Sequence, residues 1–128
     1  MAQILLIEPD RILAGHIQAY FANADHKVAA HTDLQQAIAA VDKAKLSLVI
    51  MELQLAGRSG IEFLYEFRSY PDLQRVPVII YSSLKQEEIA VYSNVFRDLG
   101  IDRILYKPEA SLSVLLEAAA NCLAPATV

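Results

Sequence analysis

Four side chains able to take part in ionic or acid–base chemistry follow apolar runs along this 128-residue chain. They are two carboxylates, one hydroxyl and one ammonium: Glu8, Glu52, Ser82 and Lys107. Each follows a segment that resembles a buried strand, and parallel strands present their carboxyl ends at one edge of a sheet. We therefore expect the four groups to lie together, where the simplest chemistry is ion pairing of the strand-end acids with Lys107.

The elements expected to position these groups are five apolar runs separated by helix-period segments. Strands are predicted over residues 3–7, 28–31, 46–51, 76–81 and 101–106. Helices are predicted over about 10–23, after a cap at Thr32 or Asp33, and from Gly60 to the residue before Pro71. Two more are predicted over about 86–99, with Gly100 at the end, and over about 111–123. The first, third and fourth strands are apolar on both faces, which predicts a doubly wound α/β fold with a helix-covered parallel sheet.

Composition narrows the class of protein. A length of 128 residues with 55% hydrophobic residues predicts one domain, residues 1–128, with a single core. The lone Cys122 cannot form an internal disulfide, and no signal peptide or apolar stretch of roughly 20 residues is present. We therefore expect a cytoplasmic protein with no membrane insertion. The net charge of −4 argues against direct nucleic-acid binding.

Four short motifs stand at the strand ends in a fixed order. They are residues 4–8, residues 48–60 with Gly57 and Gly60, residues 77–83, and residues 106–108. In this order they resemble the first strand, phosphoacceptor loop, fourth strand and lysine–proline step of the receiver domain of two-component response regulators. The resemblance covers about residues 2–123. It implies a flavodoxin-like (βα)5 three-layer sandwich, with a parallel five-stranded sheet in strand order 2-1-3-4-5.

The resemblance implies a chemistry for these residue types. In the family, a carboxylate attacks the phosphohistidine of a sensor kinase and becomes an acyl phosphate. An acidic pair holds the magnesium ion that neutralises the phosphoryl group, a lysine adds positive charge, and a hydroxyl bonds a phosphoryl oxygen. The matching positions are Glu52 for the acceptor, Ser82 for the switch hydroxyl, Lys107 for the phosphate-binding lysine, and Glu8 with Asp10 for the acidic pocket.

The chain departs from the family pattern at three positions. Glu52 stands where the family has aspartate, and its carboxylate reaches about 1.3–1.5 Å further. A misplacement near 1 Å can cost on the order of 100-fold in a positioned reaction. Pro9 takes the place of a direct magnesium ligand, so Asp10 is left either to substitute in part or to serve a plain helix start. Ile104 stands at the switch-aromatic position, and Tyr106 lies on the same side of its strand.

Other interpretations of these residues remain open at this point. Glu8 and Glu52 can be ordinary strand-end acids, and Ser82 can be a turn residue. The three histidines are scattered over helix, turn and strand, and we expect structural or solvated roles for them. The residues expected on an interaction face are Ile89, Tyr92, Phe96 and Tyr106, although the same helical stripe is typical of a core-facing surface.

These observations lead to two main functional hypotheses. The first is a degenerate pseudo-receiver, not an enzyme, that acts without phosphorylation through protein–protein interaction. Its partner would be a histidine kinase, a downstream signalling protein or a second copy, bound through the last two helices and the strand between them. The alternative is a working phosphoacceptor that uses Mg²⁺. Under the first hypothesis we expect no cofactor, or at most weak Mg²⁺ binding. A flavin or nucleotide site is disfavoured, because the carboxylates of Glu8 and Asp10 would repel a phosphate.

Overall fold

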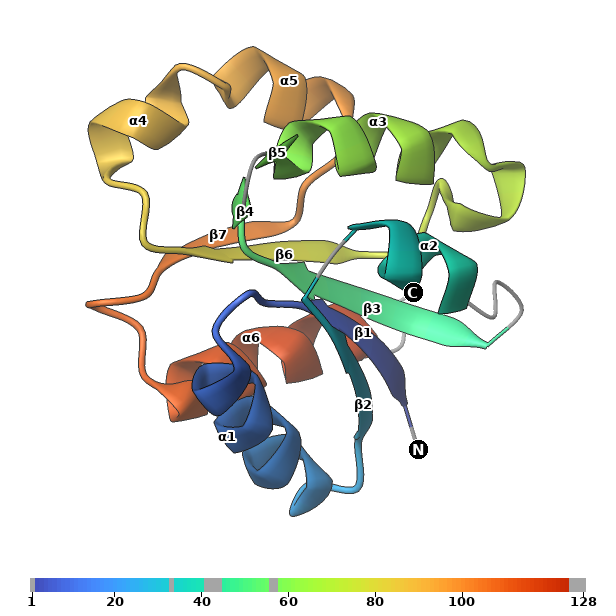
Figure 1. The fold of residues 1–128 in the computed structure, drawn as a ribbon, viewed down its shortest axis with the longest axis vertical. Helices are drawn as coiled ribbons and strands as arrows, with labels where there is room; N and C mark the ends of the chain where they lie inside the picture. The colour runs from blue at the N-terminus through green and yellow to red at the C-terminus, as the bar shows by residue number, and fades with distance from the viewer. Residues whose placement is uncertain (1, 33, 41–44, 56–57, 125–128) are drawn as a thin grey trace.

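A parallel five-stranded sheet forms the centre of the protein (Figure 1). The computed structural model describes residues 2–32, 34–40, 45–55 and 58–124. The sheet strands are β1 (Gln3–Ile7), β2 (Lys27–His31), β3 (Leu46–Met51), β6 (Val78–Ser82) and β7 (Arg103–Tyr106). Their spatial order is β2-β1-β3-β6-β7, and all neighbouring pairs are parallel. Counted along the chain within this sheet, that order is 2-1-3-4-5, so the predicted flavodoxin-like α/β fold is confirmed.

Helices cover both faces of the sheet (Figure 1). On one face lie α1 (Arg11–Ala22) and α6 (Leu112–Leu123). On the other face lie α2 (Leu34–Ala40), α3 (Gly60–Ser69), a short 3-10 helix (Pro71–Leu73), α4 (Gln86–Ala90) and α5 (Ser93–Asp98). Within the described ranges, no helix is long and apolar enough to cross a membrane.

The two faces of the sheet form two apolar layers because successive strand residues point to opposite sides. Ile4, Leu6 and Ile50 pack with Ile17 and Phe21 of α1 on one side. On the other side, residues such as Leu5, Val49, Ile80, Phe63 and Phe67 form the second layer. This double burial explains why β1, β3 and β6 are almost continuously hydrophobic.

Polar side chains and one glycine fix several helix ends. Asp10 caps α1 by accepting from the backbone N–H groups of Ile12 and Leu13, at 3.0 and 3.2 Å. Ser111 caps α6 in the same way through the N–H of Val114, at 3.3 Å. Gly100 has a φ of +66°, which confirms the predicted glycine stop after the α5 region.

Two details of the chain path differ from the sequence-based expectation. The helix expected over residues 86–99 is broken into α4 and α5 at Val91 and Tyr92. Tyr92 and Phe96 pack against the apolar layer that contains Phe63 and Phe67 of α3, which we call the α3-side core. Their ring centroids lie 6.0 Å apart, and the side chain of Val91 is 78% exposed. In the turn after β3, a two-stranded antiparallel hairpin joins β4 (Gln54–Leu55) to β5 (Arg58–Ser59), and no sequence signal predicted it.

Candidate functional site

The four candidate side chains meet at the carboxyl edge of the sheet. Glu8 follows β1, Glu52 follows β3, Ser82 ends β6 and Lys107 follows β7. Glu8, Glu52 and Ser82 are almost fully buried, and the Lys107 side chain is 18% exposed. The parallel strand order therefore assembles one compact polar cluster from segments that lie far apart in the sequence.

The carboxylate of Glu52 is the centre of this cluster and accepts six hydrogen bonds. Donors to Oε2 are the backbone N–H of Leu53 at 2.7 Å, the N–H of Gln54 at 3.1 Å and the hydroxyl of Ser82. Donors to Oε1 are the N–H of Ser83 at 3.1 Å, the Ser83 hydroxyl at 3.3 Å and the Lys107 ammonium at 2.9 Å. Both carboxylate oxygens are therefore saturated by groups of the protein.

These donors keep the buried Glu52 ionised. Burial alone would raise its pKa, but hydrogen bonds from Ser82, Lys107 and the backbone outweigh that effect, so the pKa lies below its ordinary value. A carboxylate that accepts several N–H and O–H bonds gains more from ionisation than it loses by desolvation. Glu52 is therefore a fixed negative charge at the strand edge.

Lys107 lies between two carboxylates. Its Nζ is 2.7 Å from Oε1 of Glu8 and 2.9 Å from Oε1 of Glu52. Burial would lower the pKa of Lys107, whereas the hydrogen bonds to Glu8 and Glu52 raise it above its ordinary value. The ring of Tyr81 lies beside the ammonium, with Nζ 5.9 Å from the ring centroid. The ammonium thus provides the positive charge between the two acids.

The carboxylates of Glu8 and Asp10 do not fit a magnesium site. One oxygen of Glu8 accepts from Lys107 and the other accepts from the backbone N–H of Asp10 at 3.0 Å. Asp10 is exposed and uses Oδ1 to cap α1, and Pro9 offers no ligating side chain. In the parts of the chain that are described, no three His, Cys, Asp or Glu side chains are grouped so as to hold a metal ion. A cation at this edge would also face the ammonium of Lys107.

Ser83 was not predicted as a site residue, although it donates hydrogen bonds to Glu52 from both its N–H and its hydroxyl. Its position directly after Ser82 was the available signal.

Packing explains why position 60 is a glycine. A Cβ there would lie 2.7 Å from Cε of Met51 and 3.2 Å from the carbonyl oxygen of Glu52. The other glycine of the motif, Gly57, lies outside the described residues.

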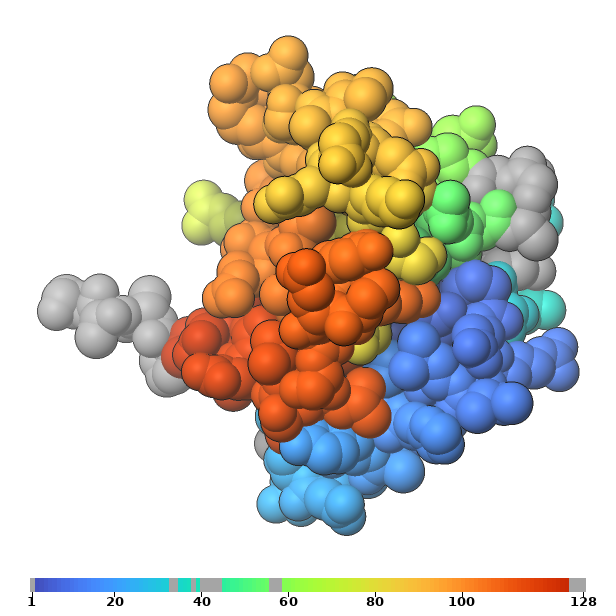
Figure 2. Space-filling model, turned by 90° about the vertical axis from the view of Figure 1, so that its left-hand side faces the viewer, coloured from blue at the N-terminus to red at the C-terminus, as the bar shows by residue number. Residues whose placement is uncertain are grey.

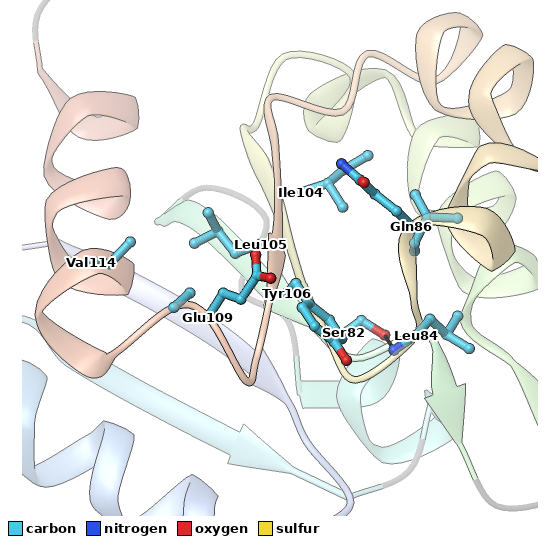
Figure 3. Close-up of a pocket in the computed structure, with 10 residues that line it drawn as sticks. Ser82, Leu84, Gln86, Ile104, Leu105, Tyr106, Glu109 and Val114 are labelled. Atoms are coloured by element: carbon cyan, nitrogen blue, oxygen red, sulfur yellow. Dashed lines mark hydrogen bonds between the residues drawn. The ribbon is translucent and has the colours of Figure 1, made fainter.

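A groove of about 440 Å³ lies next to this cluster, between α4 and α6. Ser82 is part of the polar cluster and also lines the groove. Ile104 and Tyr106 of β7 line the groove as well (Figure 3). Figure 2 shows the same face, with α4 and α5 above, the β7 region in the middle and α6 below. The switch-aromatic position, Ile104, is 42% exposed here.

The residues expected on an interaction face fall into two groups. Ile89 and Tyr106 line the groove, and Tyr92 is partly buried against the α3-side core. The expectation for Phe96 is wrong, because its side chain is only 4% exposed and packs in that core. The buried Phe96 agrees with the other interpretation of the helical stripe, in which the stripe faces the core.

A parallel sheet of order 2-1-3-4-5, with acids, a hydroxyl and a lysine at its carboxyl edge, defines a receiver-type α/β domain. The chain belongs to the response regulator receiver domain family, whose sequence profile matches residues 4–120. It is thus a receiver domain of two-component signalling, and receiver domains are generally non-enzymatic signalling domains that interact with histidine kinases or other proteins.

Curated relatives are similar over part of their own length. The chain is 33% identical to Regulatory protein VanRB of Enterococcus faecalis over 86 residues, which covers 67% of this chain and 38% of that protein. It is 26% identical to the Probable transcriptional regulator ycf29 of Cyanophora paradoxa, over 94% of this chain and 57% of that protein. This chain therefore spans about two fifths to three fifths of these relatives.

Solved structures share the fold at low sequence identity. Chemotaxis protein CheY4 of Vibrio cholerae superposes with a TM-score of 0.84 at 20% identity, covering 96% of this chain and 99% of that chain. A sensor protein from Polaromonas sp. JS666 gives a TM-score of 0.84 at 16% identity, with 95% of each chain covered. At such identities the likeness concerns the fold alone.

Proposed function

We propose that residues 1–128 form one receiver domain that works without phosphorylation and transmits its signal by binding a protein partner. In this pseudo-receiver, Glu52 takes the place of a phosphorylated acceptor, Ser82 is the switch hydroxyl and Lys107 is the phosphate-binding lysine. Glu8 and Asp10 are the remains of an acidic pocket that binds Mg²⁺ weakly at most.

The observation that carries the proposal is the saturation of Glu52 by protein donors. A nucleophilic carboxylate needs a free lone pair and room for the incoming phosphoryl group. Glu52 is only 3% exposed, and both its oxygens already accept hydrogen bonds from Ser82, Ser83 and Lys107. In the family, a phosphoryl group recruits the hydroxyl and the lysine, whereas here the longer side chain of Glu52 holds both without one.

The contacts of Glu52 also support a fixed output state. Ser82 and Ser83 stand at the start of the loop that leads into α4, and Glu52 binds both. The Ser82 hydroxyl in turn accepts from the N–H of Leu84 at 3.1 Å, and Leu84 lines the neighbouring groove. The negative charge of Glu52 is thus linked by direct contacts to the face that would bind a partner.

Intact-mass measurement tests the proposal. The protein is incubated with acetyl phosphate and Mg²⁺, and the mass of the chain is measured before and after. We expect no stoichiometric gain of one phosphoryl group. A gain that the Glu52→Gln variant abolishes would overturn the proposal and favour the alternative, a working phosphoacceptor. Mg²⁺ titration adds a second readout, because a working phosphoacceptor requires metal binding. We expect no binding of Mg²⁺ at concentrations up to several millimolar.

A further inference from the structure

The groove between α4 and α6 runs along the outer edge of β7. Three consecutive strand residues, Ile104, Leu105 and Tyr106, line it. Successive strand residues point to opposite faces of a sheet, so a groove that contacts all three must follow the strand edge. Figure 3 agrees with this geometry, because Ile104 and Tyr106 lie on the α4 side of β7 and Leu105 lies on the α6 side.

The backbone of β7 is available on this edge. β7 is the last strand in the order β2-β1-β3-β6-β7, so across the described part of the chain only β6 pairs with it. A strand at the edge of a sheet keeps one row of N–H and C=O groups that another chain can bind. β7 has four residues, which limits an added strand to a short stretch.

Apolar side chains flank the edge on both sides. On the α4 side the groove is lined by Leu84 and Ile89, and on the α6 side by Ala110 and Val114. Val114 is 38% exposed, so part of this apolar surface faces solvent. An extended segment with apolar side chains at alternate positions would place them in both halves of the groove while its backbone pairs with β7.

The charges around the groove favour a basic partner over a second copy of this chain. Four exposed glutamates lie on α4 (Glu87 and Glu88), in the loop before α6 (Glu109) and on α6 (Glu117). Two exposed basic residues lie directly before α4 (Lys85) and on β7 (Arg103). Glu109 itself lines the groove. A twofold dimer through this face would bring the same net negative surface against itself. A segment with lysine or arginine residues would complement it.

We propose that the outer edge of β7 binds an extended basic segment of a partner protein by strand addition. This docking mode rests on the proposed function, since it specifies how a receiver that signals by protein binding holds its partner. The segment pairs through its backbone with β7, inserts alternate apolar side chains beside Ile104 and Leu105, and places a basic side chain near Glu109.

A displayed library of random nine-residue peptides, selected on the whole chain, tests this docking mode. We expect enriched peptides to alternate apolar and polar residues and to carry lysine or arginine. An enriched peptide is then synthesised with N-methyl groups at alternate backbone nitrogens, and its Kd is measured by fluorescence anisotropy. Loss of the paired backbone donors should weaken binding about tenfold or more.

Variants at partly exposed positions connect the binding to the groove. Ile104→Glu and Val114→Glu should each weaken binding about tenfold or more, whereas Ile12→Glu, a 74% exposed apolar residue on α1, should leave the Kd unchanged. Glu109→Lys should reduce the preference for basic peptides. Slowed amide exchange in β7 on binding would support strand pairing.

Other results would overturn the docking mode. These are selection of peptides with helical spacing, unchanged binding after N-methylation, no enrichment over the Ile104→Glu protein, or a dimer through this face in sedimentation. Each binding measurement is repeated with acetyl phosphate and Mg²⁺. Strand pairing that occurs only with acetyl phosphate would contradict the phosphorylation-independent function but keep the docking mode. Binding by a helical peptide without acetyl phosphate would contradict the docking mode but keep the phosphorylation-independent function.

Discussion

At the scale of single residues, the added methylene of Glu52 changes what the pocket can do. The longer side chain carries its carboxylate out to the Ser82 hydroxyl, the Ser83 N–H and the Lys107 ammonium together. These groups come from β6, its following loop and the end of β7, so one side chain ties three segments. These contacts make Glu52 a structural anchor at the edge of the sheet.

The ionisation of Glu52 predicts a specific dependence of stability on pH. Its pKa in the folded protein lies below the ordinary value of 4.5, so its charged form stabilises the fold above about pH 4.5. That contribution is lost as the pH falls through the lowered folded-state pKa. At pH 7 we expect Glu52→Gln to lower the free energy of unfolding by about 2–4 kcal/mol, because Lys107 loses one of its two buried partners.

Urea unfolding of both proteins between pH 7 and pH 3 measures this effect. The difference in unfolding free energy should stay constant down to about pH 4.5 and shrink below it. Glu66→Gln, a change at an exposed glutamate of α3, is the matched surface control. A difference that stays constant throughout, or grows toward low pH, would contradict the assignment of a stabilising ionised Glu52.

Four of the central residues could be predicted from the sequence because each follows an apolar strand. The role of Ser83 could not be predicted, because the direction of a backbone N–H depends on how the loop after β6 turns. The sequence left two roles open for Asp10, and the structure places its carboxylate on the N-terminus of α1. Such choices depend on loop geometry, which residue type and spacing do not determine.

At the scale of elements, the divided helix α4–α5 is held mainly at its two ends. α4 has no buried residue, and in α5 only Phe96 is buried. At the N-terminal end, Glu52 binds the Ser82–Ser83 loop. At the C-terminal end, the guanidinium of Arg68 donates to the carbonyls of Leu99 and Gly100. The same guanidinium also donates to the carbonyls of Leu73 and Val76, in the segment between α3 and β6. Contacts at both ends, together with the buried Phe96, therefore hold this segment against the rest of the domain.

The Arg68 contacts predict a large effect of one substitution. Arg68→Met should lower the free energy of unfolding by about 2 kcal/mol or more, because four carbonyls lose a charged donor. Amide exchange at residues 99–101 should become faster in the same variant. Arg75→Met, at an exposed arginine, should change stability by about 0.5 kcal/mol or less. Equal effects in the two variants would argue against Arg68 as the C-terminal anchor.

The sequence predicted the strands well, because burial on both faces leaves continuous apolar runs that are easy to recognise. Two strands match the predicted bounds fully, Gln3–Ile7 and Leu46–Met51. The break in the helix over residues 86–99 was not predictable, since the segment contains neither glycine nor proline before Gly100. Packing of Tyr92 and Phe96 against the α3-side core overrides the local helical pattern there.

At the scale of the whole molecule, the receiver fold keeps its architecture although Glu52 and Pro9 depart from the family pattern. The sheet and both apolar layers do not depend on Glu52 being a phosphoacceptor, because they are built from β1, β3, β6 and the helices. Under the proposed function, the fold keeps a binding face while its pocket accepts no phosphoryl group. In that case the native protein should be insensitive to the ligands that normally act on a receiver.

Thermal unfolding tests this insensitivity. Addition of Mg²⁺ with acetyl phosphate should leave the Tm of the native chain unchanged, because the acids that would bind the metal are already paired with Lys107. A ligand at 100 times its Kd adds about 2.7 kcal/mol of stability, which would raise the Tm of a domain this size by several degrees. The double variant Pro9→Asp, Glu52→Asp supplies a metal ligand and shortens the acceptor, so its Tm should rise on addition of Mg²⁺. A Tm increase in the native chain equal to that of the variant would show that Glu52 and Pro9 do not block the site.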